Sequence, residues 1–578
     1  MTASESAGPE LVLGPMLRYV SETEATIWVE TDRECQVAVL GRDTSTFEVA
    51  GHHYGLVVID GLAPGGEYEY QVALDGITRW PLPGSGFPPS VLRTLSPDRP
   101  FRLAFGSCRV TEIAPPGAER PDALAASART LRDMPRQNWP DVLLMIGDQV
   151  YADDPGPATR QFIADHRAAR SADSAPSAPE APPGEIADFA EYCALYREAW
   201  SDPAIRWLFS VVPTAMIFDD HDVHDDWNTS AAWRRAASAK PWWGRRIVSA
   251  YQSYWVYQHL GNLSPDELAS NETWAKVRQS GDAAPVLADL AHRADQRSPD
   301  IRWSFARTFP GMYPQHTGGR VRVVVLDSRS RRVVDGDRRL MADEGEWRWL
   351  TESVAGEWEH MVIATSVPPL LPRGIHMLEA WTERIAGGAW GRWATGFAER
   401  LRRDFDLEHW PAFGASFAKL EQLLTDLAAG RLSPQGNPPV SVTVISGDIH
   451  HSYLAAVDLP RPAGTRVATA SGPRRTSAVY EAVCSPFHQA MPPKMRYAQR
   501  LASLKLSGLA GAVVARLAGA HIPRIKWRIT EGPWFVNLIA TLTYDGPKAI
   551  VRFDQPAPDP TDPTDPPHLA TLLEIDLT

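Results

Sequence analysis

Cysteine is scarce in this chain, with four residues in 578 and no CxxC pair. Cys35, Cys108, Cys193 and Cys484 stand far apart in the sequence, which excludes a disulfide-rich scaffold and is typical of a reducing compartment. Long basic runs are also missing, and the net charge is -12. A nucleic-acid partner is therefore not expected, because such binding depends on neutralising phosphates.

The start of the sequence does not predict a signal peptide. Its first ten residues, MTASESAGPE, contain neither the basic nor the apolar region of a secretory signal peptide. The most apolar late stretch, 501–520, is interrupted by Lys505 and Arg516, so we predict a buried helix there and no transmembrane segment. These features favour a cytoplasmic protein, or a periplasmic or secreted one if the sequence is a trimmed mature form.

Short segments rich in β-branched and aromatic residues fill the N-terminal part of the chain. They are ATIWVE, CQVAVL, YGLVVI and YEYQVAL. A turn-forming GLAPGG precedes the last of them, and a Pro-rich run follows at 80–90. The pattern predicts an N-terminal β-sandwich domain at residues 1–96, of the immunoglobulin or fibronectin type III kind.

Six continuous apolar runs characterise residues 97–554. They are FRLAFGSC, DVLLMIGD, TAMIFDDHD, VRVVVLDS, MVIATSVP and SVTVISGD. Strands buried on both faces have this composition, and helical stretches at 187–200, 342–354 and 415–429 separate them, so we predict one large α/β catalytic domain. Residues 555–578 are predicted to form a Pro/Asp-rich spacer and a last strand. Residues 171–184 are predicted to form a surface loop.

Four of the six apolar runs end in chemically active residues. These ends are Ser107–Cys108, Gly147–Asp148, Asp219–His221 and Gly447–Asp448. Ligand sites in open α/β sheets lie at the carboxyl ends of the strands, so we expect these ends to form one site.

The segment FDDHDVHDD holds five Asp and two His between Asp219 and Asp226. So much negative charge at a strand end is unfavourable unless cations neutralise it, which predicts a metal site. Asp448 and His450 would point the same way on an extended strand end and could grip the same ions. The residues alone leave Cys108 open as a buried apolar group, a thiolate ligand for Fe or Zn, or a nucleophile.

Taken together, these motifs resemble the PhoD-like alkaline phosphatase family of the metallophosphatase superfamily. GDQVY, DDHD and GDIH follow in the family's order, with an SCR strand end at the front. The N-terminal sandwich, the acidic-Trp segment at 406–424, and CSPFHQ and EGPWFVNLIATL further on match the same layout. The resemblance covers nearly the whole chain. It implies a bacterial metallophosphatase with an α-β-β-α sandwich behind a fibronectin III-like domain.

The resemblance also implies two cation sites. It assigns Fe³⁺ to a first group of ligands, which are Cys108, Asp148, Tyr151, Asp448 and His450. It assigns Ca²⁺ to a second group that shares Asp148, made up of Asp220, Asp225 and Glu408. Mn²⁺, Zn²⁺ or Mg²⁺ are alternatives. Family members often have Asn where this chain has Asp225 and Asp226.

The implied reaction is hydrolysis of a small-molecule phosphate ester assisted by the cations. His221 is expected to stabilise the transferring group or protonate the leaving oxygen. Arg197 is expected to hold the phosphate, with Arg109 as second choice. A phosphomonoesterase is the main hypothesis, and a phosphodiesterase or phospholipase D-like enzyme is the first alternative. The 21 tryptophans and the β-sandwich leave a non-catalytic adhesion or carbohydrate-binding protein as the second alternative.

Overall fold

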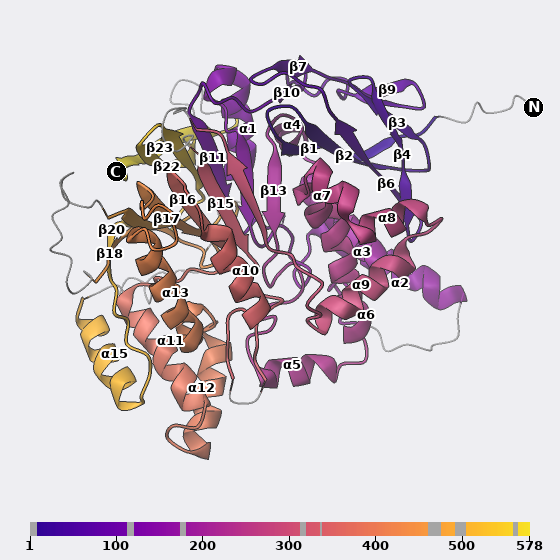
Figure 1. The fold of residues 1–578 in the computed structure, drawn as a ribbon. Coiled ribbons are helices and arrows are strands. Elements are labelled where there is room, and N and C mark those ends of the chain that lie inside the picture. Colours follow the sequence, from indigo (N-terminus) through magenta and orange to yellow (C-terminus); the bar gives the residue numbers. More distant parts are fainter. Residues whose placement is uncertain are drawn as a thin grey trace, which may run out of the picture.

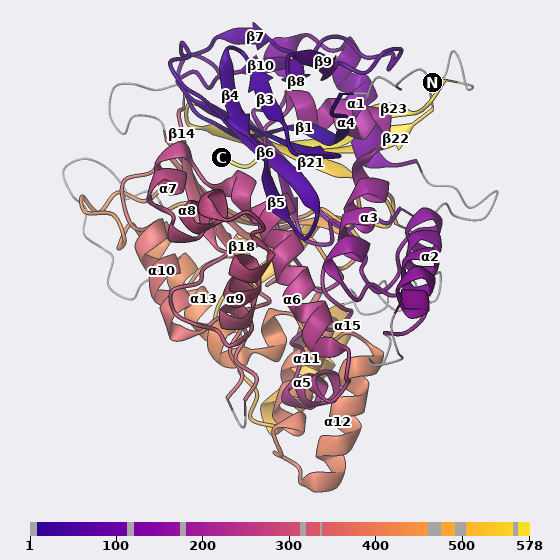
Figure 2. The ribbon, with the colours of Figure 1, turned by 90° about the vertical axis from the view of Figure 1, so that its right-hand side faces the viewer.

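The computed structural model describes residues 8–111, 121–173, 181–311, 320–335, 338–460, 476–489, 491, 505–558 and 565–578. In Figures 1 and 2 the N-terminal strands cap one end of the molecule, and the later helices gather at the opposite end. Most of the remaining strands belong to two large central sheets.

The N-terminal region consists of antiparallel sheets. One sheet has the order β1-β2-β6-β5, a second has β4-β3-β8-β9, and β10 pairs with β7. Their bounds are β1 Leu11–Val20, β2 Ala25–Thr31, β3 Gln36–Val39, β4 Arg42–Ser45, β5 Phe47–Val49, β6 His52–Ile59, β7 Glu67–Glu69, β8 Val72–Leu74, β9 Ile77–Trp80 and β10 Val91–Arg93. All of them lie within the first hundred residues, where the sequence predicts strands.

The first central sheet has six strands in the order β13-β12-β11-β21-β22-β23. Their bounds are β11 Phe101–Gly106, β12 Val142–Ile146, β13 Thr214–Ile217, β21 Ile539–Asp545, β22 Lys548–Ala557 and β23 His568–Asp576. Because β11, β12 and β13 run parallel, their carboxyl ends meet at one edge. β22 and β23 pair with each other, so the described residues after 554 continue this sheet.

The second central sheet has seven strands in the order β14-β15-β16-β17-β19-β18-β20. Their bounds are β14 Phe305–Phe309, β15 Val321–Leu326, β16 His360–Thr365, β17 Ser441–Ser446, β18 Ser452–Asp458, β19 Ala478–Val483 and β20 Lys526–Trp534. β15, β16, β17 and β19 are parallel, so their ends also share one edge.

Alternation along β15 shows how the two sheets are layered. Val323 and Val325 belong to the core shared with the six-stranded sheet, and the rings of Phe101 and Phe309 stack 4.3 Å apart across it. Val324 belongs to the core on the other face, which also includes residues of α10 and α13. Burial on both faces explains why these strands are continuous apolar runs.

Helices cover the outside of the sheets and form a separate group at one end. Their bounds are α1 Ala123–Asp133, α2 Pro157–Asp173, α3 Phe189–Trp200, α4 Pro203–Val211, α5 Ala231–Ser238, α6 Trp243–Ser253, α7 Pro265–Ser270, α8 Glu272–Gln279, α9 Ala284–Asp295, α10 Glu344–Val354, α11 Arg373–Ala386, α12 Arg392–Asp404, α13 Gly414–Ala428 and α15 Lys505–Leu517. Within the described ranges, no helix is long and apolar enough to cross a membrane.

The prediction of a buried helix at 501–520 is only half right. Helix α15 forms there, but Leu509, Val513 and Leu517 are 62–73% exposed, and residues 501–504 lie outside the described part. The side that packs inward contains small residues such as Ala515, which are enough to attach the helix to its neighbour. High mean hydropathy predicts that a helix is buried, but it does not show whether other elements of the protein cover all sides of that helix.

Candidate metal centre

The strand ends of the two sheets meet at one place. Backbone N–H of Asp448, after β17, donates to Ser107 Oγ, after β11, at 3.0 Å. Gly447 lies against the same serine, and any side chain at Gly447 would collide with Ser107. A glycine is therefore required here for the two sheets to approach each other closely.

Four of the predicted metal ligands have left-handed backbone conformations. The φ angles are 59° at Cys108, 53° at Asp148, 69° at Asp448 and 54° at His450. Non-glycine residues rarely adopt such angles, and residues that do are concentrated at functional sites. The local strain turns each side chain out of its strand direction toward the shared edge.

Cys108, Asp148 and His450 form the first potential ligand group. Their sulfur, oxygen and nitrogen atoms lie within 4.8 Å of one another. The Cys108 thiol donates to Asp148 Oδ2 at 3.3 Å, and burial followed by the neighbouring Asp148 and Asp448 raises the pKa of this thiol well above its usual range. Tyr151 lies beside the group, with its ring 4.3 Å from that of His221 and its hydroxyl donating to Gln489.

A second potential group consists of four carboxylates, which are Asp148, Asp219, Asp220 and Asp448. Burial, followed by repulsion from nearby acids, raises the pKa of Asp148 well above its usual range, and burial also raises the pKa of Asp219 and Asp220. Asp148 Oδ1 and Asp219 Oδ2 are buried and accept no hydrogen bond from the described residues. Buried carboxylate oxygens without partners are costly, so these donors fit a bound cation.

Arg329 is a member of this centre that our sequence analysis missed. It follows β15, is fully buried, and forms ion pairs with Asp219 and Glu408, and with Asp220 at 3.2 Å. Glu408 is also paired with Arg332 at 3.1 Å, so the predicted calcium ligand faces two guanidinium groups. The run VRVVVLDSR ends like the other strand ends, and this pattern could have revealed Arg329.

His221 is held by a carboxylate from another segment. Its Nδ1 is 3.0 Å from Asp153 Oδ1, and Asp153 also accepts the backbone N–H of Asp225 at 2.9 Å. Burial opposes a charge on His221, but Asp153 and Asp220 together raise its pKa well above the usual range. Asp225 itself is about half exposed, and its carboxylate is 3.9 Å from His221 Nε2. The structure therefore brings Asp225 to His221 and Asp153, not to the four-carboxylate group.

Asp448 is fixed in the same way by His409. Nδ1 of His409 contacts Glu379 at 2.6 Å, and Nε2 contacts Asp448 Oδ2 at 2.8 Å. Although burial acts in the opposite direction, His409 and Arg329 lower the pKa of Asp448 below its usual range. The buried chain Glu379–His409–Asp448 thus keeps Asp448 charged and oriented toward the centre.

The structure does not place Arg197 or Arg109 as expected for phosphate binding. Arg197 donates to the buried Glu30 of the N-terminal region at 2.6 Å and to His52 at 3.0 Å. Arg109 is paired with Asp122, the N-cap of α1, at 2.8 Å. Each of the two guanidinium groups thus neutralises a neighbouring carboxylate and contributes to packing between segments.

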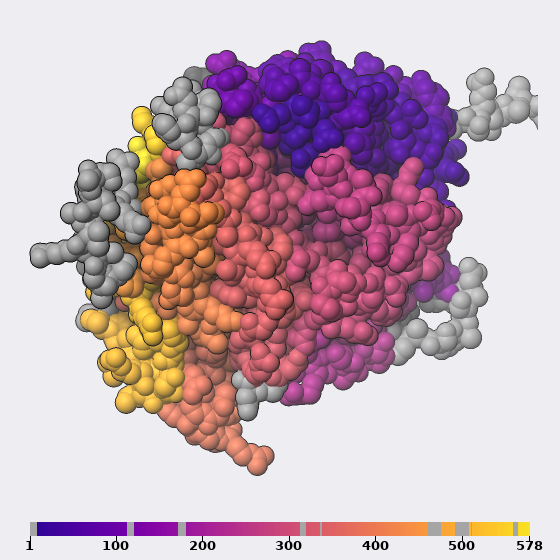
Figure 3. All heavy atoms as spheres, viewed as in Figure 1, coloured from indigo at the N-terminus to yellow at the C-terminus, as the bar shows by residue number. Residues whose placement is uncertain are grey.

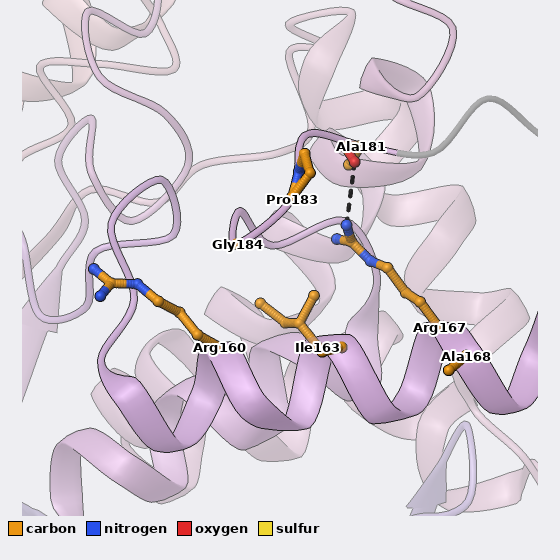
Figure 4. Close-up of a pocket in the computed structure, with 8 residues that line it drawn as sticks. Arg160, Ile163, Arg167, Ala168, Ala181, Pro183 and Gly184 are labelled. Carbon is orange, nitrogen blue, oxygen red and sulfur yellow. Dashed lines mark hydrogen bonds between the residues drawn. The ribbon is translucent and has the colours of Figure 1, made fainter.

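A pocket beside α2 lies next to the predicted loop at 171–184. Arg160, Ile163 and Arg167 line it from the helix, and Arg167 donates to the carbonyl of Ala181 at 3.1 Å (Figure 4). Residues 174–180 lie outside the described residues, and α2 continues to Asp173.

Comparisons with known proteins agree with this geometry. A model of the PhoD-like phosphatase family matches residues 125–507, and a model described as a domain of unknown function (DUF7800) matches residues 8–92. A search of curated proteins finds no match.

Among solved structures, a structure of PhoD is 13% identical, with a TM-score of 0.57, and the alignment covers 99% of this chain and 91% of that one. At this identity the likeness shows a shared fold alone. A crystal structure of amylomaltase from Corynebacterium glutamicum has a TM-score of 0.17, which is too low to support an argument.

The family model spans most of the chain and includes three of the four chemically active strand ends, those after β12, β13 and β17. A phosphatase family indicates a hydrolase, which removes the non-catalytic adhesion alternative. The acidic and histidine clusters at these strand ends suggest metal binding. This chain belongs to the PhoD-like phosphatase family.

Proposed function

We propose that this chain hydrolyses phosphate monoesters at a metal centre formed by the strand ends of both sheets. The observation that supports it best is the group of buried carboxylates with unpaired oxygens next to Cys108 and His450. The layering of the two central sheets with outer helices also supports the metallophosphatase-type α-β-β-α sandwich, and the N-terminal sheets support a fibronectin III-like domain.

The donor types divide the centre into two parts. Cys108, Asp148 and His450, with Tyr151 and Asp448 beside them, offer sulfur, nitrogen and oxygen donors that suit Fe³⁺. The carboxylates of Asp148 and Asp220 suit a harder cation such as Ca²⁺. We propose this assignment of the metals. In the second part, Asp219 replaces the expected Asp225 and Glu408 beside Asp148 and Asp220.

When bound, the cations would hold the phosphoryl oxygens and offset the charge that develops during hydrolysis. The protein then has two tasks of its own. His221, with Nδ1 fixed by Asp153, can hold a proton at Nε2 and deliver it to the leaving oxygen. Although burial acts against it, Arg329 favours the charged form of Glu408, and His409 favours the charged form of Asp448 and holds it in position.

The decisive experiment replaces Asp148, the residue common to both groups. We expect Asp148→Ala to fold with the circular dichroism spectrum of the parent protein, but to lose bound metal and at least about 10³-fold in kcat on p-nitrophenyl phosphate. The control is Asp165→Ala, an exposed acid on α2 that contacts Gln161 only through surface hydrogen bonds. Normal metal content and turnover in Asp148→Ala would show that the centre is misplaced.

Two further measurements test the finer assignments. Bis-p-nitrophenyl phosphate distinguishes the phosphodiesterase alternative, and faster hydrolysis of the diester than of the monoester would overturn the monoesterase proposal. Elemental analysis of Cys108→Ser tests the thiolate, because this change keeps the size of the side chain but removes a soft ligand. Unchanged iron content in Cys108→Ser would remove Cys108 from the ligand group.

A further inference from the structure

Exposed apolar side chains are concentrated at one end of the molecule. Nine of the twelve large apolar residues that are exposed within the described ranges lie on or beside α11, α12 and α15. These nine are Leu378, Trp390, Trp393, Phe397, Phe405, Leu509, Val513, Val514 and Leu517. Scattered exposed apolar residues are normal on a protein surface, but a concentration of this kind marks an interaction site. We call α11, α12 and α15 the helical lobe.

Helix α15 presents its larger side chains to the outside. Its packing side includes Gly508 and Gly511, where an added Cβ would lie 2.8 Å from the Cβ atoms of Arg373 and Met377 on α11. Its outer side carries Leu509, Val513 and Leu517, spaced by four residues. A helix at a water-covered surface has the opposite arrangement, whereas small residues inside and large apolar residues outside suit an apolar environment.

Helix α12 has a similar apolar face with a basic border. Trp393 and Phe397, one turn apart, are 89% and 53% exposed, while the small residues Ala394 and Ala398 face α11. Arg392, Arg400 and Arg403 on the same helix are exposed. Aromatic residues on one face and arginines around them are typical of helices that lie in the interface of a lipid bilayer.

The charge of the helical lobe differs from that of the whole chain. Residues 373–404 contain six arginines and four acids, and α15 adds Lys505 and Arg516 without any acid, although the chain as a whole has a net charge of -12. An acidic protein that gathers arginines around an exposed apolar patch is complementary to a surface that is both apolar and anionic.

The shape of the helical lobe also favours a lipid surface. α11, α12 and α15 lie side by side away from the N-terminal sheets, and the α12 end projects beyond the rest of the molecule (Figures 1 to 3). A projecting edge can enter a soft bilayer. A stable interface between two protein copies requires a broader surface, about 800 Å² on each partner.

We propose that the helical lobe binds the surface of anionic lipid bilayers. Trp393, Phe397, Leu509 and Val513 would enter the boundary between headgroups and acyl chains, and the arginines of α12 would contact lipid phosphates. This contact is independent of the hydrolytic reaction. Because α12 continues directly into the segment with Glu408 and His409, binding would hold one wall of the metal centre near the lipid surface.

The test measures co-sedimentation with vesicles of phosphatidylcholine, with and without phosphatidylglycerol. We expect binding to the anionic vesicles that weakens with added salt, since the contact is partly electrostatic. Trp393→Ser/Phe397→Ser should weaken it at least about tenfold, because two large apolar groups no longer leave water. Arg400→Gln/Arg403→Gln should lower affinity for the anionic vesicles and reduce the salt dependence.

Two controls separate this binding from other effects. Ile77→Ser changes an apolar residue that is 45% exposed in the N-terminal region and should bind like the parent protein. Asp148→Ala should also bind normally, so failure of the catalytic proposal leaves this one intact. The proposal is overturned if the parent protein does not bind anionic vesicles at low salt, or if Trp393→Ser/Phe397→Ser binds equally well. A dimer that Trp393→Ser/Phe397→Ser dissociates, without vesicle binding, would instead identify an interface between two copies.

Discussion

His221 owes its position and its charge to Asp153, a residue outside the predicted ligand groups. The Asp153 carboxylate contacts Nδ1, which leaves Nε2 as the position from which a proton can be delivered. A proton donor is active only while protonated, so activity should fall as the pH rises through the pKa of His221. Asp153 raises that pKa, and its charge therefore extends the active range toward alkaline pH.

Asp153→Asn should move the alkaline fall in kcat/KM to lower pH, by on the order of one pH unit. The amide keeps the shape of the carboxylate but removes the negative charge that stabilises the imidazolium. The measurement is kcat/KM for p-nitrophenyl phosphate as a function of pH. The matched control is Asp154→Asn, whose carboxylate is 63% exposed and paired with Arg160. An unchanged pH profile with uniformly lower activity would mean that Asp153 is only structural.

Several residues of the centre could be predicted from the sequence and several could not. Cys108, Asp148, Asp448 and His450 directly follow apolar strands, and parallel strands bring their ends together whatever the loops do. The contacts of Asp153 and Arg329 depend on how distant segments approach one another, which periodicity does not reveal. The pairing of Arg197 with Glu30 could not be predicted either, because the two residues are far apart in the sequence.

At the scale of elements, α3 connects the catalytic region to the N-terminal sheets. Arg197 near the end of α3 is paired with Glu30 of β2, whose side chain is fully buried, and the Cys193 sulfur lies 3.3 Å from the Tyr54 hydroxyl of β6. Burial raises the pKa of Glu30 while Arg197 lowers it, so the arginine partly offsets the cost of burying this acid. Without its partner, the buried carboxylate would weaken the contact between the two regions.

Arg197→Met should therefore lower the free energy of unfolding by about 2 kcal/mol, less than for a fully buried pair because Arg197 is one-third exposed. Urea unfolding provides the measurement, and kcat on p-nitrophenyl phosphate should stay within about twofold of the parent under folding conditions. Arg33→Met, which breaks the surface pair with Asp32, is the control and should leave the midpoint of urea unfolding unchanged. A large loss of kcat with unchanged stability would restore Arg197 to the active site.

The sequence predicted the positions of the helices more accurately than the elements that pack against them. The expected stretches at 187–200, 342–354 and 415–429 appear as α3, α10 and α13 with ends within two residues. α15 also appears, but its exposure differs from the prediction, since composition indicates an apolar helix without identifying its neighbours. The expected spacer after 554 begins inside β22, because Pro556 and Ala557 still pair with β23.

For the molecule as a whole, the acidic centre ties stability to metal content and pH. Burial, with repulsion from neighbouring acids, raises the pKa of Asp148, Asp219 and Asp220 above the usual range, while the unfolded chain ionises near about 4. Between these values the folded, metal-free protein binds more protons than the unfolded one. The stabilisation that comes from these raised pKa values is therefore fully present below about pH 4. It is lost as the pH rises through the pKa values of the folded protein.

Removal of metal by a chelator should accordingly lower the melting temperature more at about pH 9 than at about pH 5, with a difference of at least about 4 °C. A bound cation favours the ionised form of the carboxylates. The melting temperature of the metal-loaded protein should therefore depend less on pH. Thermal unfolding of chelated and reloaded protein at both pH values provides the test. The same decrease at the two pH values would show that metal is not linked to these acids.

The position of β11 and Cys108 between early and late segments of the chain has a consequence for synthesis of the protein. Cys108 follows β11, whose neighbours in the sheet are β12 and the much later β21. The edge of β11 thus stays unpaired until residues 539–545 have left the ribosome, more than four hundred residues after Cys108. Cys108 Sγ contacts the carbonyl of Asp448, so we also expect its thiol to stay open to oxidants until this later segment has been made and has folded over it.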